Sequence, residues 1–202
     1  MTKPTDTATR GRKGQQTRER LLGAAIAEFR RAGMAAADTG AIVAAAGVAH
    51  ATFYFHFPTK EHVLIELERR EEERMAAELT RRFAAPHDVR ATLTEAIAVL
   101  EQLKVRLGRY LFKDFVGLHF SSTAPPTDEW ATHPFIVAVV DDLTRARDDG
   151  QIPADVDVMH NGISFLVGLY ALLIAIPEPI REPFLDEYLR TYLYGLRVLP
   201  GR

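Results

Sequence analysis

Basic side chains gather in the first 60 residues of the 202-residue chain. This segment holds nine Lys and Arg against four Asp and Glu, a balance of +5, whereas residues 61–202 carry −7. Such a distribution indicates an anionic partner at one end of the molecule, nucleic acid first among them. An uneven surface with no partner is the alternative. The basic residues are Lys3, Arg10, Arg12, Lys13, Arg18, Arg20, Arg30, Arg31 and Lys60.

Residue types needed for several catalytic chemistries are missing. The chain has no cysteine, which excludes a disulfide, a thiol nucleophile and a cysteine-bound metal. It contains no G-x-S-x-G, Walker A or H-E-x-x-H motif, and its seven histidines show no metal-binding spacing. We therefore expect no enzymatic activity, no cofactor and no metal site.

Composition is that of a soluble globular protein, with 47% hydrophobic and 26% charged residues. The first residues are polar and charged, which does not fit a secretory signal. The longest apolar run, 162–176, is shorter than the roughly 20 residues that span a bilayer. We expect a cytoplasmic protein that has no membrane partner.

Apolar residues recur at helical spacing, and no segment alternates as a strand would. The pattern predicts an all-α fold of about nine helices. Residues 1–14 are polar and without periodicity, so we expect a flexible basic arm there. Helices are expected near 15–33, 39–46, 49–56, 60–86, 88–108, 109–120, 134–150, 155–176 and 180–199.

The segment Asp38–Lys60 predicts two short helices joined by a tight turn. Asp38 suits an N-cap, Gly47 ends the first helix, and Pro58 stops the second. Such a pair is typical of a helix-turn-helix, whose second helix is presented to the major groove of DNA. Its small core is expected to contain Ile42, Ala46, Val48 and Phe53.

This region resembles the TetR family of transcriptional regulators over about 17–67, a quarter of the chain. The resemblance implies a three-helix DNA-binding domain at 15–58 and a larger ligand-binding and dimerisation domain at 59–202. The motif positions that carry it are Phe29, Gly33, Ile42, Ala46-Gly47-Val48, Thr52-Phe53-Tyr54, Phe57 and Lys60-Glu61.

The resemblance also implies which residues contact DNA. Thr52, Tyr54 and His56 fall on recognition-helix positions, with Tyr54 bonded to a phosphate. Lys60 falls where family members touch the phosphate backbone, and Thr39 and Gly40 fall on second-helix positions that face DNA.

The recognition helix departs from the family pattern in two ways. Ala49 replaces the usual Ser or Thr cap, and the helix contains no Lys or Arg for a bidentate guanine contact. We expect His50 and Phe55 to contact bases instead, Phe55 through a thymine methyl group. Affinity then depends on phosphate contacts from Arg10, Arg12, Lys13, Arg18 and Lys60, with strong salt dependence. A disordered, solubilising tail is the alternative role for the basic residues of 1–14.

Bulky side chains between 103 and 135 exceed what one helical seam buries, which indicates an apolar cavity. We expect a mostly apolar, aromatic or acyl ligand, oriented by His119, His133 or His160. Core packing is the alternative role for each residue. The expected lining is Leu103, Leu107, Phe112, Phe115, Val116, His119, Phe120, Trp130, Phe165 and Leu169.

The last two helices are too hydrophobic to remain exposed, and the resemblance favours burial in a homodimer over burial within one subunit. The expected interface contains Phe184, Leu185, Tyr188, Leu189, Tyr192, Leu193 and Leu196.

Together these features predict a DNA-binding regulator, a repressor that a small apolar ligand releases from a double-stranded DNA operator. The alternative is a ligand-binding dimer with a degenerate DNA-binding domain that acts through a protein partner.

Overall fold

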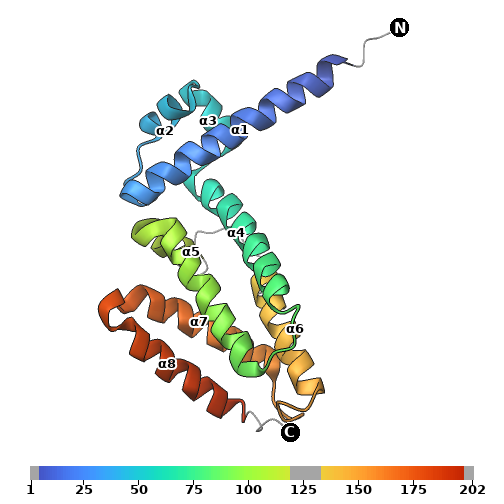
Figure 1. Cartoon of the computed structure of the whole chain (residues 1–202). Helices are drawn as coiled ribbons and strands as arrows, with labels where there is room; N and C mark the ends of the chain where they lie inside the picture. The colour runs from blue at the N-terminus through green and yellow to red at the C-terminus, as the bar shows by residue number, and fades with distance from the viewer. Residues whose placement is uncertain (1–4, 119–132, 198–202) are drawn as a thin grey trace. The chain divides into compact units, whose positions relative to one another are not determined.

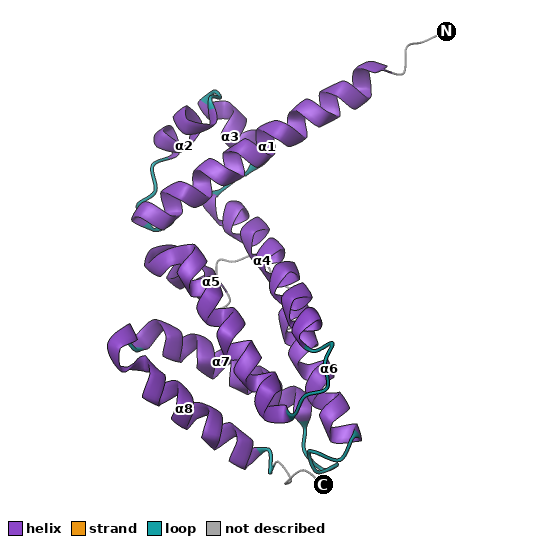
Figure 2. Cartoon of the chain, viewed as in Figure 1, coloured by secondary structure: helices purple, strands orange, loops and turns teal. Residues whose placement is uncertain are grey.

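The computed structural model describes residues 5–118 and 133–197. Within these ranges every regular element is a helix (Figures 1 and 2), which confirms the all-α prediction. The helices are α1 (Thr5–Ala32), α2 (Thr39–Ala46), α3 (His50–His56), α4 (Lys60–Arg82), α5 (Val89–Leu118), α6 (Pro134–Asp148), α7 (Val158–Ala175) and α8 (Glu178–Gly195).

The chain divides into two compact units, and α4 and α5 contribute to both. The described residues of the first unit are 5–68 and 107–118, and those of the second are 69–106 and 133–197. The division differs from the boundary expected at residue 59. The start of α4 and the end of α5 group with α1–α3, and Lys60, Glu66 and Asp114 in these segments bond to α1 or to the loop that follows it.

The first unit is built on the apolar face of α1. Leu21, Ala25 and Phe29 recur at helical spacing and are fully buried. Ile42 of α2 and Phe53 of α3 are also fully buried. The predicted core of the helix-turn-helix is therefore present, except that Val48 is half-buried.

Helix α1 begins ten residues earlier than the sequence pattern predicts. The expectation of an arm without regular structure is wrong for residues 5–14, which form the first turns of α1. Gly11 and Gly14 do not interrupt the helix, and no proline lies between them and its C-terminus. Arg10, Arg12 and Lys13 are good helix formers, and this polar segment continues the helix without an apolar face.

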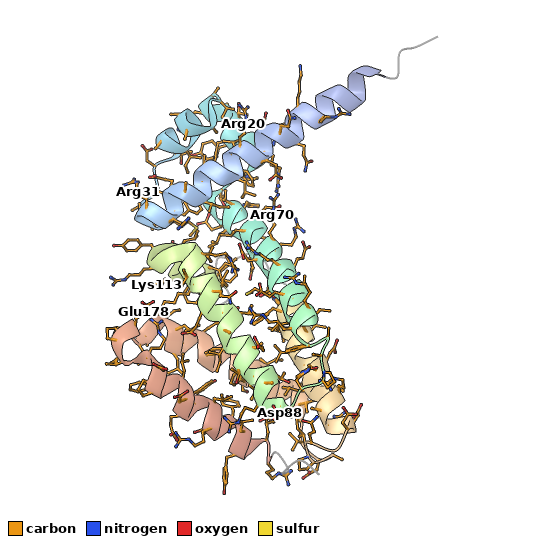
Figure 3. All side chains as sticks on the ribbon, in the orientation of Figure 1. Arg20, Arg31, Arg70, Asp88, Lys113 and Glu178 are labelled. Carbon is orange, nitrogen blue, oxygen red and sulfur yellow. The ribbon has the colours of Figure 1, made fainter. Side chains whose placement is uncertain are left out.

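Helix α5 contains the boundary that was expected between two separate helices. Gly108 has φ 72° and ψ 171°, so the helix breaks there and resumes at Arg109. A residue with a side chain rarely adopts such a positive φ. Asp88 caps the start of α5 by accepting a hydrogen bond from the Ala91 backbone N–H at 2.8 Å (Figure 3).

The second unit packs α7 against α6 and α8. A β-carbon on Gly162 would lie 2.9 Å from Val140 Cγ2, and one on Gly168 would lie 2.2 Å from the Tyr188 hydroxyl oxygen. By length and hydropathy α7 is long and apolar enough to cross a membrane. Seven of its residues are nevertheless buried in the unit, so it serves as a core helix.

The charged run 66–74 is exposed on one side of α4 only, although its composition suggests a fully solvent-exposed surface. Glu68 and Glu72 are 5% and 3% exposed. In the second unit, Glu72 Oε2 accepts a hydrogen bond from the Phe135 backbone N–H at 2.9 Å. The residue before α6, His133, provides no side-chain cap, so Glu72 satisfies an otherwise free N–H at that helix end.

Asp142 of α6 is the centre of a buried polar network in the second unit. Its carboxylate accepts a hydrogen bond from Thr92 Oγ1 at 2.6 Å and from Arg145 Nη2 at 2.7 Å. His87 Nε2 lies 2.8 Å from its Oδ2. Burial raises the pKa of Asp142, but these hydrogen bonds outweigh that effect and hold the pKa below the usual 3.8.

The close contact between α7 and α8 predicts that Gly168→Ala destabilises the second unit. The new methyl group would overlap the Tyr188 hydroxyl, which donates a hydrogen bond to the Phe165 carbonyl at 2.7 Å. We expect the free energy of unfolding to fall by about 1–3 kcal/mol in chemical denaturation. Gly195→Ala is the matched control, since nothing lies within 4 Å of its β-carbon position. Equal changes in the free energy of unfolding for the two substitutions would show that this contact does not limit the residue at position 168.

The Asp142 network predicts a pH-dependent contribution to stability. The pKa of Asp142 is lower in the folded state than in the unfolded state. Its ionised carboxylate therefore stabilises the fold fully above the pKa of an unfolded Asp, and this stabilisation is lost as the pH falls through the folded-state pKa. Asp142→Asn should cost about 2 kcal/mol at neutral pH, and the difference from wild type should narrow below about pH 4. Urea unfolding of both proteins over a pH series measures the cost of the substitution and how that cost changes with pH. A constant difference at every pH would exclude an ionised Asp142 as the cause.

Candidate DNA-binding site

Helix α2 has the bounds that the sequence predicts and is capped at both ends. Asp38 Oδ1 accepts a hydrogen bond from the Gly40 backbone N–H at 2.8 Å. At the other end, Gly47 has φ 64° and its N–H bonds to the Ala44 carbonyl at 3.1 Å. Only glycine adopts this left-handed conformation readily, so Gly47 sets the turn that leads into α3.

Helix α3 presents most of its side chains outward. Phe53 is buried, whereas Tyr54 is 50% and Phe55 is 83% exposed. The rings of His50 and Tyr54 stack with their centroids 5.8 Å apart. Ala49 provides no side-chain cap, as the sequence predicts. Thr52 and His56 are half-buried, and because they are four residues apart they lie on the same side of α3.

Charged side chains hold the loop between α1 and α2 in place. Lys60 Nζ donates to the carbonyls of Met34, Ala35 and Ala37 at 2.7, 3.1 and 3.2 Å. The ammonium group at the start of α4 therefore satisfies three backbone oxygens of this loop. Lys60 is expected at a DNA phosphate from the family resemblance, whereas the structure places its ammonium group on this loop.

Two carboxylates that the sequence analysis did not single out bind N–H groups of the same loop. Asp114 Oδ2 accepts from the Met34 N–H at 2.6 Å, and Glu28 Oε1 accepts from the Asp38 N–H at 3.2 Å. Hydrogen bonds from Arg31 and from the Asp38 N–H lower the pKa of Glu28 to about 2. No sequence pattern links Asp114 to a loop 80 residues away, so only the folded chain reveals it.

The basic residues of α1 have different surroundings. Arg12 and Lys13 are exposed, on the half of α1 that extends beyond α2 and α3 (Figure 1). Arg18 is half-buried, where its guanidinium lies 3.1 Å from Glu66 and 4.8 Å from the centre of the Phe57 ring. Arg10 lies in the first turns of α1, where only the backbone is described. Thr39 and Gly40, at the start of α2, are half-buried.

The expected ligand-lining residues are divided between the two units. Leu103, Phe165 and Leu169 are buried in the second unit. Leu107, Phe112, Phe115 and Val116 are buried in the first unit. His119, Phe120 and Trp130 lie outside the described residues. The two other expected histidines have different surroundings. His133 Nδ1 lies 3.9 Å from Glu72 Oε1, whereas His160 is exposed.

A groove of about 450 Å³ lies between α5 and α8 in the second unit. None of the expected ligand-lining residues lines it. Its cations, Lys104 and Arg181, bond to the Leu173 and Ile176 carbonyls at the end of α7, at 2.6 and 3.0 Å. Burial and the nearby Arg181 lower the pKa of Lys104. Both cations thus cap a helix C-terminus, where positive charge is favourable. The remaining lining combines four carboxylates with four apolar side chains, which are Glu101, Glu178, Glu182 and Asp186 and Ile97, Val105, Leu185 and Leu189.

The expected dimer residues of α8 fall on two faces. Leu185, Leu189, Leu193 and Leu196 are buried within their own unit. Tyr188 and Tyr192 are half-buried against Phe165, with ring centroids 5.4 and 5.1 Å from it. Phe184 is exposed, together with Ile180 and Tyr194. The leucine stripe is therefore the internal face of α8, which helical spacing cannot distinguish from an external apolar face.

The fold and the exposed face of α3 define a helix-turn-helix protein with a second all-helical unit. Residues 21–67 match the family described as bacterial regulatory proteins, tetR family. The match covers α2, α3 and parts of α1 and α4. No protein of curated function matches the sequence.

Solved structures share the fold over most of the chain. FadR from Thermus thermophilus, a TetR-family transcriptional repressor in complex with lauroyl-CoA, has a TM-score of 0.68 at 21% identity, covering 92% of this chain and 97% of that one. RolR in complex with resorcinol has a TM-score of 0.66 at 18% identity, covering 95% and 98%. The TetR-family protein CprB from S. coelicolor A3(2) has a TM-score of 0.61 at 24% identity, covering 92% and 90%.

The bonds from Lys60 predict that Lys60→Met loosens the loop between α1 and α2. Three backbone carbonyl groups, two of them in part-buried bonds, lose a charged donor, which should cost about 1–3 kcal/mol. Backbone amides in the loop and in α2 should then exchange faster with solvent deuterium. Lys13→Met, at an exposed position on α1, should leave the stability and the amide exchange rates unchanged. Unaltered exchange in the Lys60 variant would show that these bonds do not hold the loop.

Proposed function

We propose that the protein is a ligand-responsive DNA-binding regulator, a repressor that leaves its operator when a mostly apolar small molecule binds. The observation that carries this proposal is the outward face of α3, where Phe53 is buried while Tyr54 and Phe55 are exposed. A helix that packs through one residue leaves its other side free to enter a major groove. It lies in the segment that matches a family of bacterial regulatory proteins.

The proposed DNA contacts fall into three groups. His50, Thr52 and Phe55 contact bases, and His56, Thr39 and Gly40 lie beside the DNA. Tyr54 bonds to a phosphate, as do the basic side chains of α1. Since α3 contains no Lys or Arg, the electrostatic part of the affinity comes from outside it. The basic residues proposed for phosphate contact are Arg10, Arg12, Lys13 and Arg18 of α1, whereas Lys60 is proposed to hold the loop between α1 and α2.

We infer that the protein acts as a homodimer in the cytoplasm. Ile180, Phe184 and Tyr194 of α8 and Met159 and Ile174 of α7 are exposed. Association of two copies about a two-fold axis would bury such side chains. These exposed residues replace the buried leucines of α8 as the proposed contacts. Such a dimer binds two half-sites about 34–36 Å apart.

Ligand binding is proposed to shift the dimer towards a form that does not fit this spacing. Support for an acyl or aromatic ligand comes from the similar structures, which contain lauroyl-CoA and resorcinol. In the second unit, Leu103, Phe165 and Leu169 are the apolar residues proposed to contact the ligand. The proposal assigns the protein no catalytic role.

The test measures binding of the full chain to labelled DNA from upstream of its coding sequence, and to scrambled DNA, over a salt series. We expect preference for the upstream DNA and an affinity that falls steeply with salt. Arg12→Ala with Lys13→Ala should weaken binding and reduce the slope of log affinity against log salt by about two. Tyr54→Phe should weaken binding to all sequences alike.

The matched control removes two exposed cations elsewhere in the first unit, by Arg109→Ala with Lys113→Ala. This variant has the same net charge as the Arg12 and Lys13 variant and should keep the wild-type slope. Equal, weak binding to both DNAs would overturn the proposal. Because α3 contains no Lys or Arg, such a result would favour a ligand-binding dimer that acts through a protein partner.

A further inference from the structure

The side of α3 directly opposite its buried residue is apolar. Successive residues of an α-helix are about 100° apart, so Ala51 and Phe55 lie roughly 160–200° from Phe53. Both are exposed, and Phe55 is 83% exposed. The two residues are one turn apart and form a single outward ridge, which we call the α3 ridge.

The exposed ring of Phe55 does not stabilise the folded chain by burial. An aromatic side chain of this size gains its hydrophobic free energy only when it leaves water. Its described ring contact is with the neighbouring His56, at a centroid distance of 5.1 Å. Ala51, one turn earlier, is small and lets a partner surface approach the ring closely.

The sides of the α3 ridge are polar. Thr52 and Tyr54 lie at about 100° from Phe53, one on each side of the ridge. Tyr54 is 50% exposed, and its ring stacks on His50. A surface with an apolar centre and hydroxyl groups on both sides suits a partner that presents an apolar group between hydrogen-bonding groups.

The major groove presents one such apolar group, the C5 methyl of thymine. Alanine and phenylalanine contact it directly, whereas guanine is read best by Arg or Lys, which α3 lacks. We propose that the α3 ridge determines specificity by contact with thymine methyl groups, so that each operator half-site places thymine opposite Phe55. This inference rests on the proposed DNA-binding function and names the base that this site selects.

The experiment starts with the full wild-type chain and a random duplex library, from which bound sequences are selected. Each thymine of the selected site is then replaced by deoxyuridine, which removes one methyl group and keeps base pairing. We expect one or two positions per half-site at which uracil weakens binding about three- to fivefold. The Phe55→Ala variant should bind the thymine and uracil forms of those positions equally.

The Tyr54→Phe variant is the control within α3. It should bind all sites more weakly while it keeps the difference between thymine and uracil. Phe55 is on the surface, so Phe55→Ala should have the melting temperature of wild type.

Different results would overturn the role of the α3 ridge and the DNA-binding function. A selected site at which no uracil weakens binding, or a penalty that persists in Phe55→Ala, would overturn the role of the α3 ridge and leave the DNA-binding function standing. Selection of no sequence, with equal binding to every duplex, would overturn both.

Discussion

Burial of Phe53 is the contact on which the rest of the DNA-binding surface depends. Helix α3 has seven residues and no side-chain cap at Ala49, and an isolated helix of this length is not stable in water. Phe53 is its buried residue, and its ring centroid lies 6.0 Å from that of Phe57, which is also buried. These two rings fix both the position and the rotation of α3. Every outward residue, from His50 to Phe55, takes its direction from them.

Charged side chains also hold the helix-turn-helix, through hydrogen bonds to backbone atoms of the loop between α1 and α2. Lys60 satisfies three carbonyls of the loop between α1 and α2, while Asp114 and Glu28 satisfy two of its N–H groups. Buried or half-buried backbone groups need such partners. Asp114 comes from the last part of α5, beyond the break at Gly108. A segment distant in sequence thereby helps to set the path by which the chain enters α2.

Local signals predict the local features of this fold well. Asp38, Gly47 and Pro58 are sufficient to place α2 and α3, and Gly108 marks the break in α5, because caps and positive φ depend on neighbouring residues only. The start of α1 was predicted too late, since a polar helix has no apolar periodicity to detect. The burial of Glu72 and the division of α8 into two faces could not be predicted, because each depends on what packs against the helix. Helical spacing identifies an apolar face but not the element that covers it.

The charge distribution and the α3 surface together imply that affinity and specificity come from different helices. Exposed cations lie on α1, whereas α3 offers hydroxyl groups, histidines and an aromatic ring. Phosphate contacts are the same for every sequence, so α1 alone would hold any duplex. Base edges differ in the major groove, and α3 can distinguish them without a charge of its own. In the proposed arrangement the ionic strength would govern how tightly the protein holds DNA, and the buried ring of Phe53 would govern which bases α3 can reach.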